Sequence, residues 1–338
     1  MTLAEKLTLI AENQKKIYDA GSHYTADASA TSWAYFDHSN HHNDRVARLK
    51  YNDTANGIYF NSMCERSTEL EYIPEINTSN GETFAKMCYD NKSLLKNPNI
   101  DTSKGKYFSY MHNCCSAMET TPRYDLSKGE LFNFMYWNCH MMKDPVVADV
   151  PCGKNFEGFM YNSNMIPTVA LTNMNVDIVE NTKGMFSGCH EVTEISGAVM
   201  GKNGGAAWMF RGCGKLHTIK GFKINPQAVA HASDETSDIY PMKGIKNVWD
   251  ETFEWCHELV NLEIIGENKW SGLNLKWCKK LSKESITNVI NTLSDNVTDK
   301  SITLSIKAVD DAFEDHGSAG YTFTMLCRSK PNWTIAFL

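Results

Sequence analysis

The chain has 338 residues, of which 42% are hydrophobic and 22% are charged, and its formal net charge is −7. This composition indicates a folded globular protein with room for two or three folding units rather than a disordered chain. A nucleic-acid partner is not expected, because phosphate binding needs a basic face. Membrane insertion is not expected either, because no apolar run reaches the roughly 18 residues that span a bilayer.

Residues 2–20 are predicted to form a helix, with a capping box at Thr2 and Glu5 and a C-terminal Gly21. One face of this helix repeats at steps of four and three residues, with one polar member: Leu3, Leu7, Ile10, Gln14 and Ile17. Such a seam suits a short coiled coil that joins copies of the chain. An amphipathic helix packed on its own domain explains the same pattern, and both interpretations stay open.

The same segment lacks the apolar h-region of roughly 7–15 residues that a signal peptide needs. Charged side chains interrupt it at Glu5, Lys6, Glu12, Lys15 and Lys16. We therefore expect the product to be made in the cytosol.

Residues 22–52 are expected to be a polar connector. Positions 37–44 read DHSNHHND, a set of side chains with metal-ligating chemistry. Their spacing matches no zinc template, so a solvated loop is favoured and no metal is predicted.

An internal repeat with a period of about 24 residues runs through residues 53–281. Such a period is the signature of a stacked repeat architecture. Glycine recurs with an Asp or Asn four residues before it and a Phe three residues after it. The glycines are Gly57, Gly81, Gly105, Gly129 and Gly153, and the matching residues are Asp53, Asn77, Asp101, Asp125 and Asp149, then Phe60, Phe84, Phe108, Phe132 and Phe156. Met or Phe recurs three residues further on.

Each position of the repeat has a predicted role. The Asp or Asn side chain opens a turn by bonding the backbone two residues on, and the glycine supplies a positive φ. Phe and Met three residues apart share one face of a helical turn, and Pro74, Pro98 and Pro122 mark strand ends. One unit is therefore predicted to be a short strand, a turn and a short helical turn. Units must stack, because none buries its apolar face alone.

Cysteine recurs in the second half of the units, at Cys64, Cys88, Cys114, Cys139, Cys189, Cys213, Cys256 and Cys278, with Ser163 in place of one. A disulfide framework is disfavoured, because eleven cysteines is an odd number and the chain is long. Metal binding by pairs such as Cys139-His140 is disfavoured, because neighbouring side chains point in different directions. We predict that these thiols are small apolar groups buried at one place in each unit. The remaining cysteines, Cys115, Cys152 and Cys327, are predicted to be out of phase with the repeat.

The repeat is interrupted once and ends before the C-terminus. Residues 225–247 are expected to be an irregular insertion, a feature often found on the binding face of repeat proteins. Residues 282–338 are expected to be an α/β cap that covers the last apolar unit. Its predicted elements are a helix that starts at Ser282, a strand over 301–306, helices near 307–315 and 321–329, and a final strand over 333–337.

The sharper copies of the repeat, at 186–195 and 210–219, read Phe-x-x-Cys-x-x-Leu/Val-x-x-Ile. This pattern resembles the BspA-like class of leucine-rich repeats. Residues 1–13 and the Asp-Thr-Ser-x-Gly turn at 101–105 resemble proteins of phages and prophages of Firmicutes. The resemblance implies an α/β fold: a leucine-rich-repeat solenoid over 53–281, with an N-terminal helix over 1–21 and a C-terminal α/β cap.

The sequence contains no GxSxG, P-loop, dinucleotide-binding glycine motif or HExxH, so we expect neither an enzyme nor a cofactor. Candidate binding residues lie at outward strand positions and in the insertion: Tyr72, Glu194, His217, Thr218, Tyr240, Asn261 and Glu263. Aromatic residues suited to sugar stacking or protein contact are Trp208, Tyr240, Trp255 and Trp277. A solvated sheet face is the alternative interpretation.

The resemblance implies a phage virion protein, associated with the tail or baseplate, whose repeat body binds the host surface or decorates the particle. The expected partners are other tail or baseplate proteins, sister copies held through the N-terminal helix, and a host-surface glycan or protein. A virion protein released by lysis needs no secretion signal. The alternative is a bacterial leucine-rich-repeat adhesin or interaction scaffold.

Overall fold

The computed structural model describes residues 54–67, 70–73, 75–96, 100–120, 123–230, 245–313 and 319–338. The predicted helix over 2–20, with Leu3, Leu7, Ile10, Gln14 and Ile17, and the connector over 22–52 lie outside these residues. So do the three prolines of the repeat and most of the insertion over 225–247, Tyr240 included. The described chain is a mixed α/β structure with two parallel sheets and few helices.

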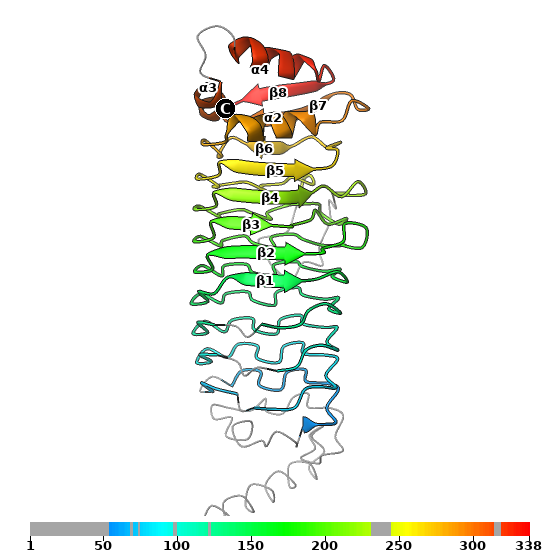
Figure 1. The fold of residues 1–338 in the computed structure, drawn as a ribbon, viewed down its shortest axis with the longest axis vertical. Coiled ribbons are helices and arrows are strands. Elements are labelled where there is room, and N and C mark those ends of the chain that lie inside the picture. The colour runs from blue at the N-terminus through cyan, green and yellow to red at the C-terminus, as the bar shows by residue number, and fades with distance from the viewer. Residues whose placement is uncertain are drawn as a thin grey trace, which may run out of the picture.

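Figure 1 shows the strands of the larger sheet one above another in chain order, with the C-terminal helices at one end. The five-stranded sheet has the order β1-β2-β3-β4-β5, and the three-stranded sheet has the order β6-β7-β8. The strands are β1 Val146–Asp149, β2 Thr168–Thr172, β3 Glu194–Ser196, β4 Thr218–Lys223, β5 Asn261–Ile265, β6 Leu273–Leu275, β7 Lys300–Leu304 and β8 Trp333–Phe337. The helices are α2 Lys283–Asn291, α3 Ile306–Ala312 and α4 Ala319–Arg328.

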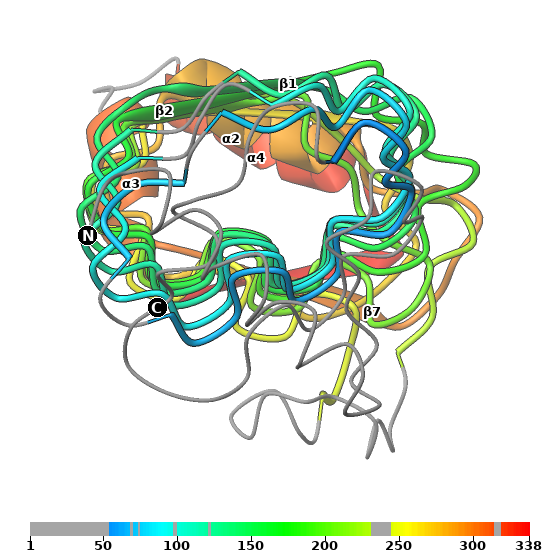
Figure 2. The same cartoon turned by 90° about the horizontal axis from the view of Figure 1, so that it is seen from below.

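Successive repeat units pair in parallel outside the named strands as well. Seen along the stack, the units superimpose (Figure 2). A chain of single parallel bridges joins residues 22 to 26 positions apart: Tyr59, Thr83, Tyr107, Leu131, Asn155, Asn181, Asn203 and Val229. Each unit therefore makes its backbone hydrogen bonds with the units before and after it.

The recurring phenylalanines of the repeat form one column. Phe84, Phe108 and Phe132 are fully buried and lie one above another, with ring centroids 5.5 and 5.6 Å apart and interplanar angles of 9° and 3°. Phe60 and Phe156 extend the column at its two ends, at 5.6 and 5.0 Å. Burial of one such ring stabilises the fold by roughly 1.5–3 kcal/mol relative to exposure, so the column is a large part of the core.

The role predicted for the repeat glycines is wrong. Gly81, Gly105, Gly129 and Gly153 do not have positive φ. A Cβ atom added to Gly81 would lie 2.5 Å from Cζ of Phe84, and at the other three positions it would collide with the ring three residues on. Glycine is needed because the stacked phenylalanine ring occupies the space of its side chain.

The predicted turn at the Asp or Asn position is confirmed for three units. The side chains of Asn77, Asp101 and Asp125 accept hydrogen bonds from the backbone N–H two residues on, at 3.1, 2.9 and 3.0 Å. These Asx turns set the direction in which the chain enters the core phenylalanine.

The predicted short helical turn is wrong, because the segment from Phe to Cys is a run of β-turns. No described residue from 55 to 282 is helical. In one unit, the N–H of Met111 donates to the carbonyl of Phe108 at 3.1 Å, and Tyr110 between them has a φ of 60°, as in a type II turn. Alternate N–H groups donate to the next unit, as Phe108 does to Leu131 at 2.8 Å. The spacing of three between buried residues therefore comes from turns.

The cysteines form two columns rather than the single predicted one. Cys115, and not Cys114, occupies the buried position, and its Sγ donates to the carbonyl of Cys88 at 3.0 Å. Cys114 is half-buried and has a φ of 62°. The same bond to the preceding unit is made by Cys139, Cys189, Cys213 and Cys256 and by the hydroxyl of Ser163. Cys64 and Cys88 lie three residues earlier in the unit, in the column that continues with His112.

The C-terminal segment has the predicted order of helices and strands. Ser282 is the N-cap of α2, and its side chain accepts a hydrogen bond from the N–H of Ser285 at 3.2 Å. The buried face of the helix includes Ile286, Val289 and Ile290, which recur at helical spacing. The predicted strands and helices after it correspond to β7, α3, α4 and β8, with boundaries shifted by a few residues.

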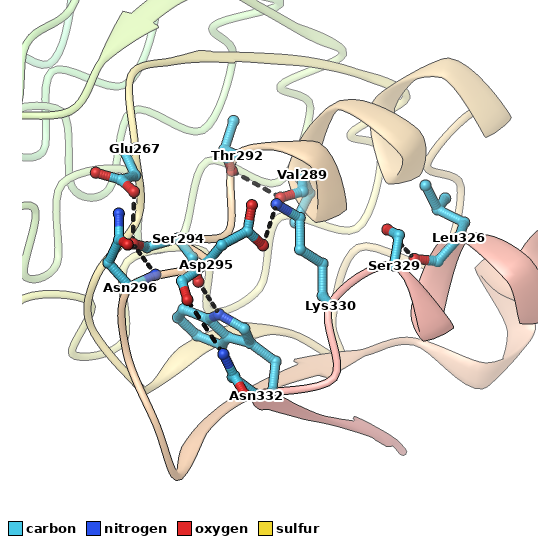
Figure 3. A network of polar contacts seen from close by, with 11 residues as sticks. Glu267, Val289, Thr292, Ser294, Asp295, Asn296, Leu326, Ser329, Lys330 and Asn332 are labelled. Carbon is cyan, nitrogen blue, oxygen red and sulfur yellow. Dashed lines mark hydrogen bonds and ion pairs between the residues drawn. The ribbon is translucent and has the colours of Figure 1, made fainter.

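A polar network joins the start of β8 to the loop after α2 (Figure 3). The indole N–H of Trp333 donates to the carbonyl of Ser294 at 2.8 Å, and Lys330 pairs with the carboxylate of Asp295 at 3.0 Å. The side-chain amide of Asn332 donates to the carbonyl of Asp295 at 3.1 Å. These contacts attach the last strand to the rest of the C-terminal segment.

Helix α2 covers the free edge of β5. Oγ of Ser285 donates to the carbonyl of Val260 and accepts the N–H of Leu262, both at 2.9 Å. The amide of Asn288 likewise accepts the N–H of Ile264 at 2.8 Å and donates to the carbonyl of Ile264 at 3.2 Å. An open strand edge favours pairing with another chain, so these two side chains close the larger sheet.

Candidate functional site

Five of the seven candidate binding residues lie together on the outer face of the larger sheet. Glu194 in β3, Thr218 in β4 and Asn261 in β5 are direct neighbours in the strand register. The amide nitrogen of Asn261 donates to Oγ1 of Thr218 at 3.2 Å, and Nδ1 of His217 lies 3.2 Å from the same oxygen. We call Glu194, His217, Thr218, Asn261 and Glu263 the sheet-face row, and contacts at Oγ1 of Thr218 join three of its members.

The two carboxylates of the sheet-face row, Glu194 and Glu263, both contact β4. Oε1 of Glu194 lies 2.9 Å from Nζ of Lys220, an exposed pair that contributes little to stability. Glu263 accepts a hydrogen bond from the N–H of Gly221 at 2.9 Å. The register of β4 shifts here and Gly221 has a φ of 63°, so the bulge turns this N–H toward the carboxylate.

Two open hollows flank the row and share Thr218. The smaller one, which we call the second hollow, has a volume of about 390 Å³ and is lined by residues of β4, β5 and the first half of α2. Thr218 is only 9% exposed, so its neighbours supply the accessible polar groups. The first hollow, of about 710 Å³, is lined by Thr193, Glu194, Lys215, His217, Thr218 and Glu258.

The remaining two candidates are not part of this face. Tyr72 is 51% exposed and pairs in parallel with Lys96, near the N-terminal end of the described chain. Tyr240 lies outside the described residues. The sequence analysis grouped Tyr72 with the others because outward strand positions look alike in every unit.

A third hollow, of about 310 Å³, opens between residues 123–126 and the start of β1, and the buried Tyr136 is part of its lining. Beside it the buried ring of His112 stacks between those of Tyr124 and Tyr136, at 5.8 and 5.6 Å. Nε2 of His112 lies 2.8 Å from the hydroxyl of Tyr124. Burial lowers the pKa of His112 to about 3, so this imidazole is neutral at pH 7.

The structure also shows a continuous aromatic surface, of which only Trp208 and Trp255 were named from the sequence as candidates for ligand contact. Side chains of the turn segments in successive units form an outer aromatic strip: Tyr89, Tyr110, Phe134, Trp137, Tyr161, Trp208 and Trp255. Ring centroids are 4.8 Å apart for Tyr110 and Phe134 and 5.6 Å apart for Phe134 and Trp137. Phe134 and Trp208 belong to one apolar cluster, separate from the main core.

Backbone conformation explains why the strip was not predicted as one continuous surface. Tyr110, Phe134 and Trp208 have φ values of 60°, 57° and 58°, a left-handed conformation that bulky residues rarely adopt. Asn138 and Asn162, which suit this conformation, occupy the second left-handed position of their units. The sequence contains one pattern that indicates this strip, because aromatic residues stand two positions after the core Phe108 and Phe132.

The buried thiols have raised pKa values, which disfavour a role as nucleophiles. Burial raises the pKa of Cys189 to about 12 and raises that of Cys213 and Cys256 well above the ordinary value. A cysteine nucleophile needs a lowered pKa, whereas these thiols stay protonated and donate to carbonyls. Among the described residues no three His, Cys, Asp or Glu side chains are placed to hold a metal ion.

No protein-family model matches the chain, and no curated protein matches it. None of the helices within the described ranges combines the length and apolar character needed to cross a bilayer. The sheet-face row and the outer aromatic strip are therefore the features from which function is inferred.

Proposed function

We propose that residues 53–281 form a leucine-rich-repeat solenoid of the BspA-like type, capped by residues 282–338. The parallel bridges between successive units and the stacked column from Phe60 to Phe156 support this proposal. In such an architecture each unit packs mainly on its two neighbours, so the outer faces are long and continuous.

We further propose that the protein is a non-enzymatic component of a phage virion, associated with the tail or baseplate. Its repeat body binds the host surface or decorates the particle. The observation that carries this proposal is the sheet-face row with its two hollows, since it presents polar groups on hydrogen-bonded neighbouring strands. Binding sites on strands are held more rigidly than sites on loops. The resemblance of residues 1–13 to phage proteins supports the virion assignment.

The predicted N-terminal helix provides the attachment. Its seam of Leu3, Leu7, Ile10, Gln14 and Ile17 would join sister copies or other tail proteins. Mass measurement of the full chain and of a chain that lacks residues 1–21 tests this point. The full chain is expected to be an oligomer and the shortened chain a monomer, and two monomers would remove the coiled-coil role.

Purified particles and host cells test the proposed function. Mass spectrometry should find the chain in purified phage particles, and the purified chain should adsorb to host cells in competition with the particles. Replacement of Glu194 and Asn261 by Ala should weaken this adsorption, because both side chains stand on the sheet-face row. A chain found at a bacterial surface and not in particles would favour the adhesin alternative, and a chain found in neither place would refute both.

A further inference from the structure

We propose that one end of the outer aromatic strip is a binding subsite for a neutral hexopyranose unit of a glycan. The subsite consists of Trp208, Arg211, Glu251, Glu254 and Trp255. This inference rests on the proposed host-surface role, and it names a surface and a ligand class for it. The surface lies on the turn segments, away from the sheet-face row.

Trp255 supplies the exposed platform of the subsite. Its side chain is 41% exposed, and Cζ of Arg211 lies 4.4 Å from its ring centroid. The same Cζ lies 5.5 Å from the ring of Trp208, so two indoles hold the guanidinium. The negative face of an indole attracts the weakly positive C–H groups on one side of a sugar ring. Exposed indole surface of this kind is what a pyranose can stack on.

Two carboxylates and one guanidinium surround this platform. Nε of Arg211 lies 2.9 Å from Oε2 of Glu251 and 2.8 Å from Oε2 of Glu254. Within the described chain the guanidinium makes no other hydrogen bond, so its two NH₂ groups keep donors for a ligand. Carboxylate oxygens accept hydrogen bonds from hydroxyl groups. The site therefore offers both donors and acceptors at the edge of an aromatic surface.

The backbone holds three large side chains of the subsite in the left-handed conformation. Trp208, Glu251 and Trp255 have φ values of 58°, 48° and 63°. In the preceding units Gly184 takes the position of Trp208 and Gly212 takes that of Trp255, with φ values of 56° and 74°, whereas Trp208 itself takes the position of Glu251. A bulky residue in this conformation costs energy that glycine avoids. Trp255 is 41% exposed, so core packing does not account for this cost there, whereas Trp208 is 9% exposed and packs in one cluster with Phe134.

The charges select the ligand class. Two carboxylates contact one guanidinium, and burial together with the charge of Glu254 raises the pKa of Glu251. The subsite therefore has no excess of positive charge to attract phosphates, acidic sugars or nucleic acids. A neutral hexopyranose has a flat C–H face and hydroxyl groups around its rim. These features match an indole that is bordered by one donor group and two acceptor groups.

Saturation-transfer NMR of the full chain with soluble gluco-, manno-, galacto- and N-acetylglucosamine oligosaccharides tests the proposal. We expect saturable binding of at least one of them. The Trp255→Ala and Arg211→Lys variants should each raise its Kd tenfold or more, while Tyr59→Ala, a change at an exposed aromatic residue of the first described repeat unit, should change it less than twofold. Arg211→Lys keeps the charge and fold but loses the planar NH₂ groups.

The proposal is overturned if no oligosaccharide binds, if binding survives both strip variants with unchanged Kd, or if only Tyr59→Ala removes it. Host envelopes treated with periodate or with protease separate a glycan from a protein. Loss of adsorption after protease alone would identify a protein partner and overturn the subsite while the virion role stands. Absence of the chain from particles refutes the virion role without changing the oligosaccharide result, so the two failures are distinct.

Discussion

At Gly129 the missing Cβ atom lets the ring of Phe132 lie against the backbone. The sequence placed this glycine in a turn correctly, because Asp125 precedes it, and the N–H of Gly129 donates to the carbonyl of Leu126 at 2.9 Å. The left-handed residues stand elsewhere in the unit, as at Phe134. Sequence could not separate these roles, since glycine suits both a positive φ and a close contact.

Gly129→Ala should lower the free energy of unfolding by roughly 1–3 kcal/mol, because the added methyl group overpacks a rigid aromatic column. Urea denaturation measures the change. Gly214→Ala is the matched control: a Cβ atom there has nothing within 4 Å. It should change stability by less than about 1 kcal/mol. Equal losses in the two variants would contradict the assigned role of Gly129.

The buried thiols allow a second test at this scale. Iodoacetamide should modify the exposed Cys152 in the native chain and leave Cys139, Cys189 and Cys213 unmodified until unfolding. Burial raises the pKa of Cys189 to about 12, above the value of about 8.5 in an unfolded chain. As the pH rises, the Cys189 thiol loses its proton in the unfolded chain before it does so in the folded chain. The stability that comes from its protonated state is therefore full below about pH 8.5 and is lost as the pH rises toward 12.

Peptide mass spectrometry after labelling, and urea midpoints at pH 7, 9 and 10.5, give the readout. A native-state reaction of Cys189 as fast as that of Cys152 would show that the thiol column is not closed. The sequence predicted burial of these thiols but not their two columns, because Cys114 and Cys115 are adjacent and only the backbone conformation decides which one points inward.

At the scale of elements, the helices and strands of residues 282–338 were predicted more accurately than the turn segments. Ser282 and the spacing of Ile286, Val289 and Ile290 are local signals, and α2 matches them. The spacing of Phe and Met was ambiguous, because a helical turn and a type II β-turn both bring residues three apart to one side. The turn requires a left-handed residue, and sequence gives no sign that a bulky side chain such as Phe134 will adopt it.

Part of the candidate site could be predicted from the sequence, and part of it could not. Alternation in strands placed Glu194 and Asn261 on one outer face, as the register confirms. The second hollow depends on α2, whose Asn288 bonds the edge of β5. That contact joins residues 24 positions apart through two different kinds of element, and no local pattern predicts it.

Asn288→Ala should lower the free energy of unfolding by about 1–3 kcal/mol, because the N–H and carbonyl of Ile264 lose their partner. The opened edge should also cause concentration-dependent self-association. Light scattering and urea denaturation measure the two effects. Asn291→Ala, an exposed change in the same helix, should cost less than about 0.5 kcal/mol. A monomeric Asn288→Ala variant of unchanged stability would contradict the edge-closing role of α2.

At the scale of the whole molecule, contacts between neighbouring units dominate. Lysine and glutamate side chains pair across adjacent units, as in Lys106–Glu82 and Lys154–Glu130, at 3.0 and 2.6 Å. Each exposed pair contributes at most about 1 kcal/mol, so the aromatic column and the thiol columns matter more. The period of the sequence predicted this neighbour-to-neighbour packing, because residues of one type recur at the same step as the stacked units.

Removal of two whole repeat units tests the stacked architecture most directly. Deletion of residues 106–153 joins Gly105 to Lys154, which has the same place in its unit as Lys106. The shortened chain should unfold cooperatively in urea. Its maximum dimension in small-angle X-ray scattering should fall by about 10 Å, because each unit adds one strand spacing of about 4.8 Å. A chain that fails to fold, or one that keeps its original length, would contradict the stack on which both proposed binding surfaces depend.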